Sequence, residues 1–156
     1  MNLDTRKGYC AYLVTAQGTV AIRLRPAAAP RTVNNFIYLA RQGYFDGATI
    51  ARACPDPADP GCFGNLAEVA ADSGPGYTLG REAVRGQYLL GAVAMSSDGE
   101  ASSGGRFFIS TGDNRSLPHT YNLFGQVTDG IELLPALKKG LVIQTVIVSE
   151  AAGSTA

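Results

Sequence analysis

Hydrophobic and polar positions alternate in the first part of the chain, as half-buried β-strands require. Residues 9–16 and 19–24 predict two β-strands, and in the second strand Val20, Ile22 and Leu24 alternate with Ala21 and Arg23. Gln17 and Gly18 separate the two segments. A two-residue turn of this kind joins antiparallel strands, so we predict a β-hairpin.

The period changes at residues 30–42, where apolar positions recur at i, i+3, i+4 and i+7. This spacing is typical of an amphipathic helix with one apolar face. That face consists of Val33, Phe36, Ile37 and Ala40. Pro30 suits the first turn of a helix and Gly43 suits its C-terminal stop. We expect this helix to pack its apolar face on the core.

Shorter apolar segments of strand length follow along the rest of the chain. They are residues 49–54, 88–96, 107–110, 123–127 and 141–149. Residues 55–61 form a loop rich in Pro, Asp and Gly, residues 62–73 are weakly patterned, and residues 130–137 predict a second short helix. About eight strands and two helices fit a mainly β fold, either a barrel or a sandwich. A closed barrel leaves no strand edge exposed, and the helices would cover its ends.

Composition limits the class of protein. The chain has 156 residues, of which 46% are hydrophobic. We expect one domain over residues 1–156, with a core of about 8–150 and a flexible tail at 151–156. Thirteen basic residues balance thirteen acidic ones, so the basic excess of a nucleic-acid-binding protein is missing. We expect no membrane span, and no signal peptide is visible in this sequence. The expected location is the cytoplasm or the periplasm.

The three cysteines, Cys10, Cys54 and Cys62, lack the spacing of a zinc site or a redox motif. Cys54 and Cys62 bracket the loop at residues 55–61, which can bring them together as a disulfide in an oxidising compartment. The alternative is two buried thiols, since free cysteines are often buried. With one histidine in the chain, we expect no metal site.

Common catalytic motifs are absent from the sequence, including the phosphate-binding loop, GxGxxG and GxSxG. A hydrolase would require His119, the one histidine, to converge with Ser116 or Asp113. These residues lie close together in a polar segment, so we expect a surface loop there.

Five blocks of sequence follow one another in a specific order. The first comprises residues 29–36, 43–47 and 50–52, and the others are residues 74–78, 91–96, 104–109 and 121–127. Together they resemble the cyclophilin family of peptidyl-prolyl isomerases, over residues 18–148. The resemblance implies a closed eight-stranded antiparallel β-barrel capped by two α-helices. It implies a monomeric enzyme without a cofactor that isomerises Xaa-Pro bonds and assists folding, with proline-containing peptides and unfolded or partly folded proteins as its partners.

The resemblance also assigns the site. Arg52 takes the place of the family's catalytic arginine, whose charged guanidinium suits the proline nitrogen of a twisted amide. Phe108 is expected in the pocket and Phe107 in the core, because strand side chains alternate. The residues assigned to substrate binding are Cys62, Phe63, Asn65, Ser96, Ser97, Arg106, Phe108, Leu117 and Tyr121.

The chain departs from the family pattern around this site. Ile50 and Ala51 replace a Phe-His pair, Arg106 replaces a glutamine, and residues 116–118 lack the usual aromatic. These changes predict a weakened isomerase, and the alternative is a binding module for proline peptides without useful catalysis.

The alignment of the segment after the 55–61 loop has two possible registers. One places Asn65 at the family's substrate-binding glutamine, and the other places Phe63 there. We favour Asn65, because Pro60-Gly61 gives the nearer anchor and an amide side chain is retained.

Overall fold

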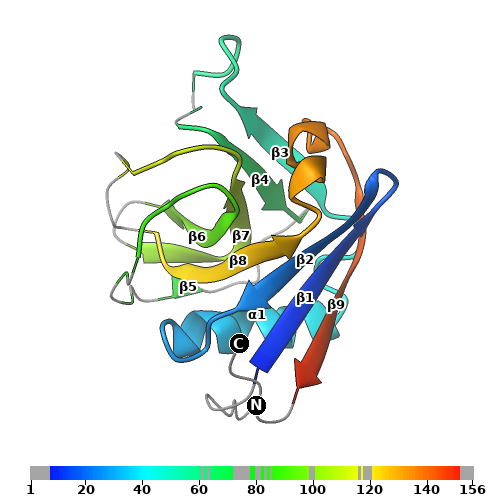
Figure 1. The fold of residues 1–156 in the computed structure, drawn as a ribbon, viewed down its shortest axis with the longest axis vertical. Coiled ribbons are helices and arrows are strands. Elements are labelled where there is room, and N and C mark those ends of the chain that lie inside the picture. Colours follow the sequence, from blue (N-terminus) through cyan, green and yellow to red (C-terminus); the bar gives the residue numbers. More distant parts are fainter. Residues whose placement is uncertain are drawn as a thin grey trace.

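The structure is a computed structural model that describes residues 8–60, 62, 64–71, 78–79, 82, 84, 86–98, 101–115, 117 and 121–151. Side chains are not described at residues 78–79, 97–98, 101–104 and 151. The strands are β1 (Gly8–Thr15), β2 (Gly18–Leu24), β3 (Thr49–Cys54), β4 (Leu66–Ala70), β5 (Thr78–Leu79), β6 (Ala92–Asp98), β7 (Ala101–Ser110), β8 (Leu123–Asp129) and β9 (Ile143–Ala151) (Figure 1). The helices are α1 (Pro30–Arg41) and the 3₁₀ helix η1 (Ile131–Ala136).

All strands join one antiparallel sheet in the order β3-β4-β7-β6-β8-β2-β1-β9, and β5 pairs with β7. The sheet curls until its two end strands meet (Figure 1). Thr49 forms a bridge with Val142, and the Ile50 N–H donates to the Leu141 carbonyl at 2.9 Å. The prediction of a mainly β, barrel-like antiparallel fold is confirmed.

The two strands nearest the described ends of the chain lie side by side. β1 pairs with β9 over its whole length, from Gly8 opposite Ala151 to Thr15 opposite Ile143. The expected tail at 151–156 begins at the last residue of β9, and residues 152–156 lie outside the described part. So do residues 1–7, where we expected no signal peptide.

Helix α1 follows the predicted pattern, with its apolar face buried and Gly43 at a positive φ of 74° just after its end. The backbone N–H groups of its first turn find a hydrogen-bond acceptor in a residue distant in sequence, Glu82. The backbone N–H groups of Arg31 and Thr32 donate to the Glu82 carboxylate at 3.1 and 2.8 Å. A carboxylate satisfies the unpaired amides of a helix start and matches its positive end. No helix among the described residues is long and apolar enough to cross a membrane.

The second predicted helix is present as η1, a 3₁₀ helix and not an α-helix. Pro135 lies inside it and has no N–H to donate, so a continued α-helical ladder is interrupted there. Leu134 and the following Leu137 are buried in the core.

Two other differences from the predicted elements have a clear cause. The strand expected at 88–96 begins at Ala92, because Gly91 turns the backbone with φ of 83° and leaves Leu89 and Leu90 exposed before it. β4 lies in the segment that showed only weak patterning. Its residues 66–69 are all buried, so both faces are covered and no alternation is visible in the sequence.

The barrel interior contains four phenylalanine rings. Phe36 of α1 lies 5.2 Å from Phe45, 5.3 Å from Phe107 and 5.2 Å from Phe124 between ring centroids. All four rings are fully buried. This interior cluster fixes which face of each strand points inward.

Candidate active site

Four residues form a row across the outer face of the barrel. Arg52 on β3 pairs with Glu68 on β4, Glu68 pairs with Phe108 on β7, and Phe108 pairs with Ala94 on β6. Residues directly opposite one another in a sheet project from the same face. Phe107 belongs to the interior cluster, so Phe108 and the row point outward.

A second apolar cluster, here called the outer cluster, surrounds Phe108 on this face. Its buried members are Cys54, Leu66, Tyr88, Ala92, Ala94, Phe108 and Leu123. Cys62, Leu117 and Tyr121, all half-buried, pack against it. Three residues that the resemblance assigned to the groove therefore pack against the cluster that contains Phe108. Phe108 itself is fully buried and lies 5.3 Å from the Tyr121 ring.

Tyr88 joins the loops that cover the outer cluster. Its hydroxyl donates to the Tyr121 carbonyl at 2.7 Å and accepts from the Tyr121 N–H at 3.1 Å. Burial raises the pKa of Tyr88 to about 12. The phenol therefore stays protonated at neutral pH and fixes the backbone of Tyr121.

Arg52 is held by an ion pair. Its Nε donates to the Asp59 carboxylate at 2.7 Å, and its side chain is 30% exposed. This hydrogen bond raises the pKa of Arg52 above its ordinary value, and the charge of Glu68 acts in the same direction. Arg52 thus carries a fixed positive charge at the edge of the outer cluster.

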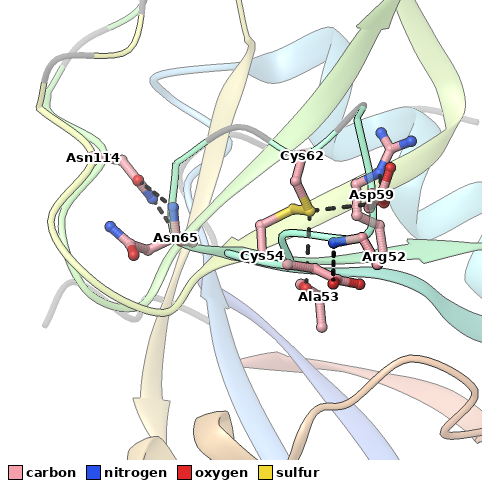
Figure 2. The surroundings of a disulfide bond; sticks show 9 residues. Arg52, Ala53, Cys54, Asp59, Cys62, Asn65 and Asn114 are labelled. Carbon is pink, nitrogen blue, oxygen red and sulfur yellow. Dashed lines mark hydrogen bonds and ion pairs between the residues drawn. A yellow bond between two sulfur atoms is a disulfide. The ribbon is translucent and has the colours of Figure 1, made fainter.

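The Cys54–Cys62 pair forms a disulfide, with 5.5 Å between the Cα atoms. Of the two alternatives left open by the sequence, the structure has the crosslink. Figure 2 shows the disulfide with Arg52 and Asp59 on one side and Asn65 and Asn114 on the other. The bond closes the loop that carries Asp59, which connects β3 to β4.

Glu68 is the site residue that the sequence analysis missed. Its side chain is 6% exposed, and its carboxylate accepts a hydrogen bond from the Ser96 hydroxyl at 2.7 Å. Ser96, an expected groove residue, is therefore buried and directed at Glu68. The sequence did contain a signal for Glu68, because it is the one acidic residue in the apolar segment 66–70. The register of this segment was uncertain, so the residues that pair with Glu68 could not be predicted.

The structure does not bring Asn65 to Arg52. Its N–H donates to the Asn114 side chain at 2.8 Å, and its side-chain amide donates to the Asp113 carbonyl at 3.3 Å. Asn65 precedes β4 and is one residue out of phase with Leu66 and Glu68, which face the outer cluster. The place beside Arg52 is taken by Glu68.

The remaining assigned residues divide into two groups. Arg106 is half-buried on β7, two residues from Phe108 and on the same outer face. Phe63 and the side chain of Ser97 lie outside the described residues. So do Ser116 and His119, while Asp113 pairs with Arg115 at 2.8 Å on the surface.

Comparisons with known proteins agree over nearly the whole chain. The family described as cyclophilin type peptidyl-prolyl cis-trans isomerase/CLD matches residues 10–151. Peptidyl-prolyl cis-trans isomerase B of Bacillus subtilis is 32% identical over 143 residues, covering 90% of this chain and 96% of the relative. The peptidyl-prolyl cis-trans isomerase of Synechococcus elongatus is 30% identical over 145 residues, covering 91% and 98%.

A solved structure shows the same fold. The cyclophilin type peptidyl-prolyl cis-trans isomerase of Cryptosporidium parvum matches with a TM-score of 0.78 at 20% identity, covering 91% of this chain and 98% of that one. The same protein in the presence of the dipeptide Ala-Pro matches with a TM-score of 0.77. The chain described here therefore belongs to the cyclophilin-type peptidyl-prolyl cis-trans isomerase family and is an isomerase of peptidyl-prolyl bonds.

Proposed function

We propose that this chain accelerates Xaa-Pro rotation in unfolded and partly folded proteins, with Arg52 as its catalytic residue. The barrier to this rotation is about 18–20 kcal/mol, because the C–N bond has partial double-bond character. When the amide twists, conjugation is lost and the proline nitrogen regains its lone pair. A group that donates to this nitrogen binds the twisted state better than either planar isomer, which lowers the barrier.

The observation that carries the proposal is the row on the outer face. In this row Arg52 lies two strands from Phe108, on the face of the sheet that carries the outer cluster. Apolar side chains there suit a proline ring, and the guanidinium supplies rigid donors that remain charged at any physiological pH. The Cryptosporidium relative, solved in the presence of Ala-Pro, supports a proline-containing ligand.

Glu68 gives the proposed groove a hydrogen-bonding character different from the one the sequence predicted. An amide side chain can donate and accept, whereas an ionised carboxylate only accepts. One Glu68 oxygen already accepts from Ser96. We expect the other oxygen to favour substrate N–H groups over carbonyls, which is a difference in substrate choice between this chain and relatives with an amide there.

The test compares isomerisation of short Xaa-Pro peptides by exchange NMR with wild type, Arg52→Ala and Arg52→Lys. We expect wild type to accelerate exchange and Arg52→Ala to lose about a hundredfold in kcat/KM, the scale for removing one transition-state donor. Arg52→Lys keeps the charge but not the planar fork, so it should also be slow. Arg41→Ala, an exposed arginine in the last turn of α1, serves as the matched control and should retain full activity.

Two results would contradict the proposal. Equal rates for wild type and both Arg52 variants would remove Arg52 from the reaction. Peptide binding by wild type without any acceleration would establish the alternative, a binding module that recognises proline but does not catalyse.

A further inference from the structure

We propose that Asp59 is a positioning residue for Arg52, and that the Cys54–Cys62 disulfide holds Asp59 in place. The isomerase then works at its full rate only while this disulfide is formed. The inference rests on the proposed role of Arg52.

The contact between the two side chains leaves the reactive end of Arg52 available. Asp59 accepts from Nε at 2.7 Å, which is the nitrogen nearest the aliphatic stem. Within the described part of the chain, the two terminal Nη nitrogens make no hydrogen bond, so they remain for the substrate. Asp59 is also well covered, with 17% of its side chain exposed. Fixing Nε orients the guanidinium plane without occupying the donors that catalysis needs.

The loop that carries Asp59 is shaped by turns between its own residues. β3 and β4 stay paired as far as Cys54 opposite Leu66, and the loop begins there. Inside the loop, the Asp59 N–H donates to the Asp56 carbonyl and the Cys62 N–H donates to the Asp59 carbonyl, both at 3.1 Å. Both hydrogen bonds join residues within the segment from Asp56 to Cys62.

The disulfide supplies the anchor. It ties Cys62 to the last residue of β3, and the Cys62 sulfur lies 3.7 Å from the Asp59 carboxylate (Figure 2). A partly exposed ion pair is weak by itself, because ordering two side chains offsets much of the attraction. A crosslink that removes loop conformations makes the pair persist. Asp59 therefore depends on the disulfide more than on its own contact with Arg52.

Reduction would release this arrangement. A dithiol reductant transfers two electrons and two protons, so that the bond between the sulfurs of Cys54 and Cys62 breaks. The products are two protein thiols and the disulfide of the reductant. The loop then gains freedom, Asp59 leaves Nε, and Arg52 samples orientations that do not reach the proline nitrogen.

The experiment measures kcat and KM of full-length wild type, Asp59→Ala and Asp59→Asn, each with and without dithiothreitol. Asp113→Ala is the matched control, because Asp113 also accepts from an arginine Nε, at 3.0 Å, but on the open surface. We expect reduced wild type and Asp59→Ala to lose about tenfold in kcat with little change in KM, as for a displaced catalytic group. Asp59→Asn retains an oxygen acceptor and should recover part of the loss. Asp59→Ala should be indifferent to reduction.

A spectroscopic readout separates positioning from general destabilisation. The Arg52 Nε–H resonance, assigned by its absence in Arg52→Lys, should be protected from exchange in oxidised wild type. It should lose protection in Asp59→Ala and in reduced wild type, while other amide signals of the barrel stay in place.

The outcomes are distinguishable. Wild-type kcat in Asp59→Ala, or in wild type whose Cys54 and Cys62 are shown by alkylation to be reduced, would overturn the inference. An equal response of Asp59→Ala and wild type to reduction would also overturn it, because the disulfide would then act without Asp59. Absence of isomerase activity in oxidised wild type, or full activity in Arg52→Ala, would instead refute the proposed function.

Discussion

Phe107 and Phe108 are neighbours on β7, yet they belong to two different regions of the molecule. Phe107 lies in the interior cluster, where it contacts other phenylalanine rings carried by regular elements or by the turn after α1. Phe108 lies in the outer cluster beneath Tyr88 and Tyr121, which come from segments without helix or strand. Both rings are fully buried. The comparison shows that two equally buried rings on one strand can have different surroundings, a cluster of phenylalanine rings on one face and a cover of loop tyrosines on the other.

The two regions also differ in how their covers are attached. In the interior, Phe107 packs edge to face against Phe36, Phe45 and Phe124, at 5.4 Å from Phe45, and these rings need no polar partner. The outer cover is held by hydrogen bonds, above all those between Tyr88 and the backbone of Tyr121. The Tyr88 hydroxyl thus connects two loops that are not paired in the sheet.

The largest effect expected is on the interior side. Phe107→Ala should lower the free energy of unfolding by about 3–5 kcal/mol, because it deletes a fully buried ring and leaves a cavity. Urea denaturation followed by circular dichroism measures this loss.

The Leu variants of both residues make the comparison sharper. Phe107→Leu and Phe108→Leu keep most of the side-chain volume and should each cost about 1.5 kcal/mol or less in stability. We expect kcat/KM to fall in Phe108→Leu alone. A similar loss of activity in Phe107→Leu would show that the two faces are not functionally separate.

An effect on stability smaller than that of Phe107→Ala is expected on the outer side, in alkaline solution. The pKa of Tyr88 is about 12 in the folded protein, against an ordinary value near 10. The unfolded chain loses this proton first, so the free energy of unfolding falls as the pH rises from 10 to 12. The loss should total about 2–3 kcal/mol, and it should be absent below pH 10. Urea titrations at several pH values measure it, and Tyr88→Phe should abolish this part of the pH dependence.

The smallest effect concerns a hydrogen bond beside the outer cluster. The Asn114 side-chain amide donates to the Ser110 hydroxyl at 3.0 Å, and both residues are buried. Ser110→Ala should lower the free energy of unfolding by about 1 kcal/mol, the usual worth of one such bond. Ser149→Ala on the exposed end of β9 is the control and should have no effect on urea denaturation. Equal losses in the two variants would argue against a role for this bond.

Local patterns in the sequence were sufficient to predict the elements that form the interior region. The helix at 30–42 and the hairpin around Gln17-Gly18 each depend on a period or a turn that adjacent residues reveal, and both are present in the structure. The alternation of side chains along a strand also predicted that Phe107 and Phe108 point to opposite faces of the sheet. Closure of the barrel was a resemblance-based expectation, since the strand count alone also allowed a sandwich.

The sequence was less informative around the site, because pairing there depends on the register across the loop between β3 and β4. Spacing along the chain could not show that Glu68, and not Asn65, stands opposite Arg52. The β3–β4 register decides this, and it contains an irregularity between Ile50 and Arg52 that adjacent residues in the sequence do not reveal. Glu68 was hidden for a second reason: β4 is buried on both faces, so the segment shows no period.

The pairing of β1 with β9 has a practical consequence. Gly8 and Ala151 lie opposite each other in an antiparallel pair, where Cα atoms are about 5 Å apart. The start of β1 and the end of β9 lie at the end of the barrel away from the β3–β4 loop (Figure 1). A short linker between these positions would allow circular permutation, with new termini opened elsewhere on the surface. A tether or fusion partner attached at this end would leave the face with Arg52 uncovered, which suits immobilised assays of the isomerase.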